Sequence, residues 1–342
     1  MRWLRFWSQR GWLVFGLCIG LLSPGVLAAP AGAEVPAVDT RSLLLRMHAA
    51  ATGRNYQGTM VFTTGSVISS SRVAHYCVGD QVFERIEMLD GKQRQIYRHN
   101  DLVHTLWSQS GTLVVERRWL QLSLPSSTQS VDPRAVEQYE PRHEGRDRIA
   151  GREAWVLLLQ PRDEHRYAQR IWADLSTGLM LRADVLGSDH AVLESSAFSD
   201  VEVDVAPQPA SVLDPIRRAE GQRVLRPTLT STTLESEGWV LARPLPGFHL
   251  TACIRRPAWV RGADPQAGPA PEVVQAVYSD GLVHVSLFIE AYDGARHRRP
   301  ITARFGATHS VALRRGEQWI TAMGDVPPAT LKILIDALER RP

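Results

Sequence analysis

Apolar and polar residues alternate at short intervals along most of the chain, a pattern typical of antiparallel β-sheets. The densest part of the pattern runs from Arg148 to Leu181. There, Ala154–Gln160 is almost wholly apolar, which predicts a strand with both faces covered. Turn residues separate it from two further extended runs, Tyr167–Asp174 and Leu179–Leu186. We therefore predict an antiparallel meander of three strands, and it carries no obvious catalytic constellation.

The same short spacing predicts an all-β region around the meander. A helix is expected to start at Asp39 or Thr40, either of which can cap it, and to end at Gly53. Asp90-Gly91 is the strongest hairpin signal, because these residues tolerate the positive φ of a tight primed turn. A short helix is expected over 133–139. The predicted strands of this region are Thr59–Thr63, Arg72–Val78, Gln81–Leu89, Lys92–Arg98, Leu102–Trp107, Thr112–Arg117 and Val192–Val203.

Residues 205–226 contain several prolines and no apolar periodicity, which predicts a linker. A chain of 342 residues is longer than one core usually supports, so we expect two domains, residues 34–204 and 227–342. A helix that opens at Pro328 is expected to cover one face of the second domain's sheet. The strands expected in that sheet are Val240–Leu241, Phe248–Ile254, Val273–Tyr278, Leu282–Ala291, His309–Leu313 and Gln318–Met323.

Residues 1–33 have the composition of a secretion signal peptide. Arg2, Arg5 and Arg10 precede an apolar run, Gly11–Leu22, that is too short for a good membrane span. Small residues follow and offer cleavage sites, so we expect an exported, soluble product. These three arginines account for the whole net charge of +3, because the remaining basic residues equal the 36 acidic ones. A neutral mature chain gives no electrostatic argument for nucleic-acid binding.

The sequence contains little that points to catalysis. It has no HExxH, GxSxG or phosphate-binding glycine loop. An acid–base set could be formed by Asp163, Glu164, His165 and Asp174, but a turn followed by a salt-bridged strand explains them equally well, and no nucleophile accompanies them. Cys77 and Cys253 remain after signal cleavage; a disulfide would suit export, but two independent buried thiols is the interpretation we favour. We predict no enzyme activity, no cofactor and no metal site.

Aromatic and large apolar residues gather in the first β region, where core packing is their default use. A curved sheet has two faces, however, and a half-covered face would leave an apolar groove for a lipid chain. The face that each residue occupies is not determined, because one slip in strand register inverts it. The candidate lipid-binding residues are Met60, Phe62, Ile86, Leu106, Trp107, Trp119 and Trp172.

Arginines gather in the second predicted domain, at Arg296, Arg298, Arg299 and Arg304. One interpretation is a solvated loop. The other is a dock for an acidic peptide or for a phosphorylated lipid head group, both of which arginine binds through charge-assisted hydrogen bonds. The pattern of residues leaves both interpretations open.

Short motifs occur in a fixed order along almost the whole mature chain. In the first predicted domain they are Asn55-Tyr56-x-Gly58-Thr59, Leu89-Asp90-Gly91, Arg148-x-Ala150-Gly151-Arg152, Pro161-x-Asp163-x-x-Arg166-Tyr167 and Trp172-x-Asp174-x-x-Thr177-Gly178-Leu179. In the second they are Tyr278-Ser279-Asp280-Gly281-Leu282 and Gly324-Asp325-Val326-Pro327. The series resembles the MucB/RseB family, periplasmic negative regulators of the envelope-stress sigma factor of the sigma-E or AlgU type. Gly324-Asp325 departs from the family pattern, in which Gly-Glu is expected.

The resemblance implies a mainly β (α+β) fold. The first domain would be a LolA/LolB-like curved open antiparallel β-barrel with plugging helices. The second would be a smaller α/β domain with an antiparallel sheet and a C-terminal helix. In this family the protein binds the periplasmic part of a transmembrane anti-sigma factor and shields it from regulated proteolysis. Lipopolysaccharide or the acyl chains of lipoproteins then release it.

These implications set the remaining expectations for this chain. The partner-binding candidates are Ser279, Asp280, Arg296, Arg298, Arg299 and Arg304. The alternative function is a periplasmic lipid or lipoprotein carrier, which would not need the second domain. The oligomeric state stays open.

Overall fold

The computed structural model of the protein describes residues 40–117, 137–258 and 271–341. The predicted signal peptide, Trp119 and most of the helix expected over 133–139 lie outside the described residues. Within the described ranges, no helix combines the length and the apolar character that crossing a membrane requires.

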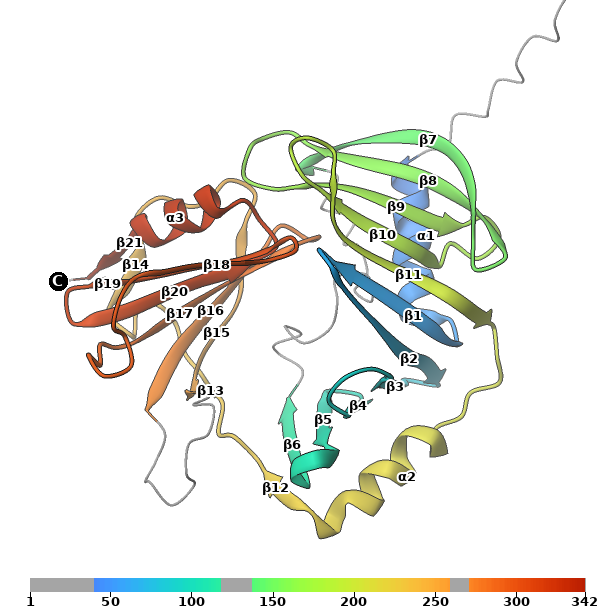
Figure 1. Ribbon diagram of the computed structural model, residues 1–342, viewed down its shortest axis with the longest axis horizontal. Coiled ribbons are helices and arrows are strands. Elements are labelled where there is room, and N and C mark those ends of the chain that lie inside the picture. The colour runs from blue at the N-terminus through green and yellow to red at the C-terminus, as the bar shows by residue number, and fades with distance from the viewer. Residues whose placement is uncertain (1–39, 118–136, 259–270, 342) are drawn as a thin grey trace, which may run out of the picture. The chain divides into compact units, whose positions relative to one another are not determined.

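The N-terminal part of the chain is built on one large sheet with the strand order β12-β6-β5-β4-β3-β2-β1-β11-β10-β9-β8-β7 (Figure 1). Its neighbouring strands are antiparallel except for β12, which runs parallel to β6. Among the described residues the two outer strands do not pair with each other, so the sheet is open. The strands are β1 (Tyr56–Thr64), β2 (Val67–Val78), β3 (Gln81–Met88), β4 (Arg94–His99), β5 (Leu102–Trp107), β6 (Thr112–Arg117), β7 (Tyr139–Ile149), β8 (Arg152–Pro161), β9 (Ala168–Asp174), β10 (Met180–Leu186), β11 (Val192–Val203) and β12 (Arg223–Leu225).

The predicted meander is confirmed as β8, β9 and β10. β8 is buried from Ala154 to Leu159, so both of its faces are covered, as its unbroken apolar run indicates. Arg148 belongs to β7, a strand that the apolar pattern did not predict. Most residues of β7 are polar and at least partly exposed, and a bulge near Gly145 (φ 111°) shifts its register. An edge strand of this kind has no buried apolar face from which it could be recognised.

Helix α1 (Thr40–Gly53) confirms the expected first helix and lies against the large sheet (Figure 1). Leu43, Leu44 and Met47 are buried in an apolar cluster that also contains Trp155 of β8. Each of these side chains contributes roughly 1.5–3 kcal/mol when fully buried. The helix therefore covers part of one face of the sheet.

Residues 205–226, expected to be a linker, fold largely onto the large sheet. They contain α2 (Ala210–Arg218), the 3₁₀ turn η4 (Ala219–Gly221) and β12. α2 packs the fully buried Val212 against aromatic residues of β2, β3 and β4. The sequence pattern missed this helix because it is short and Pro215 lies inside it.

β3 and β4 form the hairpin expected at Asp90-Gly91, but the expected tight primed turn is wrong. The last residues that pair are Glu87 and Gln95, so the connection is longer than two residues. The Asp90 carboxylate accepts hydrogen bonds from the hydroxyl and the N–H of Ser70, at 2.5 and 2.6 Å. These two bonds lower the pKa of Asp90. Anchoring by Ser70 therefore organises this loop in place of a primed turn.

The C-terminal part carries a smaller antiparallel sheet with the order β13-β15-β16-β17-β20-β19-β18 (Figure 1). Helix α3 (Pro328–Asp336) begins at the predicted proline and buries Leu331 and Leu334. β18 was not predicted, because all five of its residues are exposed. The strands are β13 (Thr230–Ser231), β15 (His249–Pro257), β16 (Glu272–Ser279), β17 (His284–Ala291), β18 (Ile301–Phe305), β19 (Thr308–Arg315) and β20 (Gln318–Gly324), with β14 (Trp239–Leu241) and β21 (Leu338–Arg340) as a separate pair.

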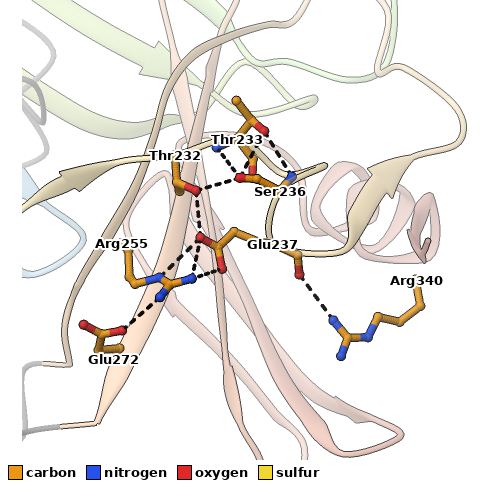
Figure 2. A network of polar contacts seen from close by, with 7 residues as sticks. All are labelled: Thr232, Thr233, Ser236, Glu237, Arg255, Glu272 and Arg340. Atoms are coloured by element: carbon orange, nitrogen blue, oxygen red, sulfur yellow. Dashed lines mark hydrogen bonds and ion pairs between the residues drawn. The ribbon is translucent and has the colours of Figure 1, made fainter. Parts of the chain in front are cut away.

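A polar network fixes the turn that follows β13 (Figure 2). Arg255 of β15 donates to both carboxylate oxygens of Glu237, at 2.9 and 2.7 Å, and Thr232 donates to one of them at 2.7 Å. Burial alone would raise the pKa of Glu237, but the hydrogen bonds from Arg255 and Thr232 outweigh it and lower the pKa. Arg340 of β21 donates to the backbone carbonyl of Glu237 at 3.3 Å. The network thus ties this turn to both C-terminal sheets.

Gly58, in the first motif, lies where β1 approaches β11 most closely. A Cβ atom at this position would lie 2.2 Å from the backbone oxygen of Asp200. We expect Gly58→Ala to lower the free energy of unfolding by about 1–3 kcal/mol, because the strands must separate to admit the methyl group. Urea unfolding measures the loss. Gly53→Ala is the control, since a Cβ there meets nothing within 4 Å; equal losses in the two variants would contradict the explanation.

Candidate partner and lipid sites

Two of the sequence motifs meet in a buried ion pair. Nε of Arg166 donates to Oδ2 of Asp280 at 2.8 Å, and both side chains have 0% exposed surface. The hydroxyl of Tyr139 donates to the same carboxylate oxygen at 3.1 Å. Burial, reinforced by the charge of Asp280, raises the pKa of Tyr139 well above its usual value, so the phenol remains a neutral donor.

The rest of the Arg166 guanidinium is also occupied. One terminal nitrogen contacts the carboxylate of Asp163, and the other donates to the carbonyl of Pro246 at 2.8 Å. The guanidinium carbon lies 4.7 Å from the centre of the Phe248 ring. Asp163 and Arg166 therefore form structural ion pairs, as the turn-and-strand interpretation of this motif predicted.

Ser279 and Asp280, two of the partner-binding candidates, are buried in this arrangement. The second oxygen of Asp280 accepts from the N–H groups of Leu282 and Val283, at 2.9 and 2.8 Å. The Ser279 hydroxyl donates to the carbonyl of Val283 at 3.0 Å. Both side chains hold the turn between β16 and β17 and present no free group to a partner in this conformation.

Asp174 has the other structural role expected from the sequence. Arg152 donates to it at 2.7 Å, and the hydroxyls of Ser176 and Thr177 donate at 2.6 and 2.7 Å. Burial alone would raise its pKa, but these hydrogen bonds dominate and hold the pKa far below the usual range. The carboxylate therefore organises the turn between β9 and β10, and the acid–base interpretation finds no support in the geometry.

The structure brings four lipid candidates together and separates two others. Met60 and Trp172 are buried in one apolar cluster, against which Phe62 and Ile86 pack half-buried. Leu106 is buried in a different cluster, beneath η4. Trp107 is 36% exposed, with the guanidinium of Arg94 stacked 5.5 Å from its ring centre. The first four residues form what we call the Met60 cluster.

The Met60 cluster encloses little free space. A cavity of 40 Å³ lies beside Met60 and Ile86, with the polar side chains of His75 and Glu84 also in its wall. Small-molecule sites usually measure about 300–1,000 Å³, whereas about 10–15 Å³ is enough for one water. A lipid chain would enter this cluster only after α1 or the sheet moved.

The basic candidates lie in the connection that leads from β17 to the edge strand β18, and on β18 itself. Arg296 pairs with Glu290 at 3.0 Å, while Arg298, Arg299 and Arg304 are exposed and have no carboxylate partner among the described residues. Arg304 belongs to β18, which pairs with β19 on one side and ends the sheet on the other.

Sequence reasoning missed the apolar half of this edge. Ile301 and Phe305 of β18 are 51% and 59% exposed. They occur four residues apart, with Ala303 between them, which is the spacing of one strand face. That alternation was the signal that could have located the strand. We call Arg298, Arg299, Arg304, Ile301 and Phe305 together the β18 edge.

Glu194 of β11 has a strongly shifted pKa and forms no ion pair with any described residue. Its pKa is raised to about 7, first by burial and then by the charge of Asp325, against a hydrogen bond from the N–H of Ala307. Between pH 4.5 and 7 the folded chain holds a proton that the unfolded chain releases. The contribution to stability is therefore complete below about pH 4.5 and is lost as the pH rises to 7.

We expect this group to make the protein less stable at pH 8 than at pH 5, by at most about 3 kcal/mol. Glu194→Gln should match the wild type at pH 5 and exceed it at pH 8, because the amide stays neutral. Urea unfolding at the two pH values tests this, with Glu202→Gln as an exposed control on the same strand. A Glu194→Gln variant as pH-sensitive as the wild type would refute the assignment.

These features define a mainly β protein with a large open sheet, a smaller sheet backed by a C-terminal helix, a separate pair of short strands, an apolar cluster and an exposed basic edge. The chain belongs to the MucB/RseB family. The family model of the MucB/RseB N-terminal domain matches residues 39–218, and that of the C-terminal domain matches residues 233–339.

Among curated relatives, the "Sigma factor AlgU regulatory protein MucB" of Pseudomonas aeruginosa is 30% identical over 328 residues, covering 94% of this chain and 96% of that protein. The "Sigma-E factor regulatory protein RseB" of Escherichia coli K12 is 24% identical over 333 residues, covering 96% and 97%. The solved complex of Pseudomonas aeruginosa MucA and MucB superposes with a TM-score of 0.67 at 26% identity, over 89% of this chain and 99% of that chain.

Proposed function

We propose that this protein binds the periplasmic domain of a transmembrane anti-sigma factor and shields it from regulated proteolysis. The observation that carries the proposal is the match to MucB along nearly the whole of both chains, together with a MucB structure solved in complex with the periplasmic domain of MucA. The protein acts in the periplasm, where residues 1–33 would direct it. It acts by occupying a surface, and no reaction is catalysed.

The β18 edge is the surface we propose for part of this contact. An edge strand has unpaired N–H and C=O groups along one side, and an extended peptide can add to it as a further strand. Arg298, Arg299 and Arg304 would select a peptide with acidic residues, while Ile301 and Phe305 would lose apolar surface to water on binding. An acidic, extended segment of the partner fits this combination.

Calorimetric titration with the anti-sigma periplasmic domain tests the proposal. Reversing three charges, with Arg298→Glu, Arg299→Glu and Arg304→Glu, is expected to weaken binding roughly tenfold to a hundredfold. The matched control reverses three exposed arginines on other elements, Arg117, Arg142 and Arg217. If both triple variants bind the anti-sigma domain with equal affinity, the contact does not lie at the β18 edge. If the wild type does not bind this domain, the proposed function is wrong.

We further propose that acyl chains of lipopolysaccharide or lipoprotein release the partner by entering the Met60 cluster. The support is an apolar cluster that lies next to α1, with Ala50 of α1 packed inside it. The 40 Å³ cavity means that binding must be coupled to a movement, which is what a release signal requires. A carrier would hold its lipid in a ligand-sized cavity instead. Transfer of lipid between vesicles without any protection of the anti-sigma domain would favour the carrier.

A further inference from the structure

A second, larger cavity lies on another part of the large sheet, between α2 and strands β3, β4 and β5. Its volume is 490 Å³, within the range of about 300–1,000 Å³ that is typical of small-molecule sites. It is separate from the Met60 cluster and from the β18 edge. Its wall mixes polar and apolar residues, and four of the residues that line it carry a charge: Arg85, Glu87, Asp214 and Arg218.

The two kinds of charge in this wall differ in their partners. The Glu87 carboxylate lies 3.8 Å from Arg72 and accepts a hydrogen bond from the hydroxyl of Tyr97 at 3.4 Å. Asp214 pairs with Arg217 at 3.1 Å. Arg85 and Arg218, by contrast, form no ion pair with any described residue. The cavity therefore offers two uncompensated guanidinium groups, one from the sheet and one from the helix.

Two residues of the same wall each carry a buried polar atom that has no hydrogen-bond partner among the described residues. These atoms are Nε of Arg85, a donor, and the side-chain oxygen of Gln222, an acceptor. Leaving a buried donor or acceptor unpaired costs about 1–3 kcal/mol each, so native structures rarely retain such atoms without a reason. Both residues line one ligand-sized cavity, and a bound molecule toward which the two side chains turned would supply an acceptor for the first atom and a donor for the second.

We propose that this cavity binds a small hydroxylated phosphoester. The phosphoryl oxygens would accept from Arg85 and Arg218, since guanidinium groups match phosphate in charge and geometry. Hydroxyl groups of the ligand would donate to the oxygen of Gln222 and to the carboxylates of Glu87 and Asp214. This ligand chemistry accounts for the unpaired donor and the unpaired acceptor together, and the proposal does not depend on the anti-sigma partner.

Calorimetric titration of the mature chain with glycerol 3-phosphate tests the site. The wild type is expected to bind, and Arg85→Gln and Arg218→Gln are each expected to weaken binding about tenfold or more, because each removes a charge-assisted hydrogen bond. Arg218 is exposed, so its variant should fold even if the Arg85 variant does not. Arg223→Gln removes the same charge at an exposed position of β12 that does not line the cavity, and this variant should bind like the wild type.

Three results would overturn the proposal. They are no binding of glycerol 3-phosphate by the wild type at millimolar concentration, equal weakening in all three variants, and binding of glycerol as tight as that of its phosphate. The same phosphoester chemistry occurs in free metabolites and in lipid head groups. Vesicles of phosphatidylglycerol distinguish these two ligands. If the protein binds the vesicles, and this binding requires Arg85 and Arg218 and is inhibited by glycerol 3-phosphate, the ligand is a lipid head group. If the protein binds glycerol 3-phosphate but not the vesicles, the ligand is a free phosphoester.

Discussion

Asp280→Ala is expected to lower the free energy of unfolding by about 3–5 kcal/mol, because it leaves the fully buried Arg166 guanidinium with the partly exposed Asp163 as its one remaining carboxylate partner among the described residues. The same substitution leaves the Tyr139 hydroxyl and two backbone N–H groups without their acceptor. Urea unfolding of the mature chain measures the loss. Asp101→Ala is the matched control, since it breaks an exposed pair with Arg117 and should cost no more than about 1 kcal/mol.

A double variant separates the burial of charge from the loss of contacts. Replacing both partners with apolar residues, Arg166→Met with Asp280→Leu, removes the buried guanidinium charge as well, while Asp163 is partly exposed and can be solvated, so much of the lost stability should return. A double variant that is less stable than Asp280→Ala would mean that hydrogen bonds to the turn, rather than the charge, dominate the energetics at this position.

Trp172→Ala is expected to cost about 3–5 kcal/mol, because the residue is 5% exposed and its large side chain is packed in the Met60 cluster. Its indole N–H also donates to Asp147 at 2.9 Å, and the Arg182 guanidinium lies 4.4 Å from its ring centre. Trp107→Ala is the comparison: at 36% exposure it should cost no more than about 1 kcal/mol. Chemical unfolding of the two variants measures both values.

The same two variants test where lipid binds. Under conditions in which both are folded, Trp172→Ala should change the affinity for a fluorescent acyl-chain probe and Trp107→Ala should not, because Trp107 lies outside the Met60 cluster. If the Trp107 variant alone loses affinity, the lipid site lies near β5. If neither changes, the Met60 cluster is a core without a ligand.

Much of the fold follows from local pattern. The meander, the first helix, the strands that became β19 and β20, and the helix at Pro328 were all predicted, because each has either a strong apolar run or clear end signals. Edge elements were missed for the opposite reason. β7 and β18 expose most of their residues, and the short α2 has a proline inside it. Such elements are stabilised by neighbours that the local sequence does not reveal.

The candidate sites were less predictable, because they depend on contacts between distant residues. Arg166 and Asp280 are 114 residues apart, and neither sequence motif indicates that its charged residue pairs with the other. The lipid candidates Met60 and Leu106 looked equivalent in the sequence but lie in different clusters. The sequence did not predict that Arg85 and Gln222 line one cavity, because this depends on how α2 packs against the sheet. Strand register and long-range packing decide these outcomes.

The most direct test of the central claim is the rate at which the site-1 protease cleaves the purified periplasmic domain of the anti-sigma factor. Cleavage is followed with and without an excess of the mature protein. The account predicts that the cleavage rate falls in proportion to the fraction of the anti-sigma domain in the complex. It also predicts that the variant carrying Arg298→Glu, Arg299→Glu and Arg304→Glu protects that domain less than the wild type does. An unchanged cleavage rate at saturating wild-type protein would contradict the assignment of a shielding function.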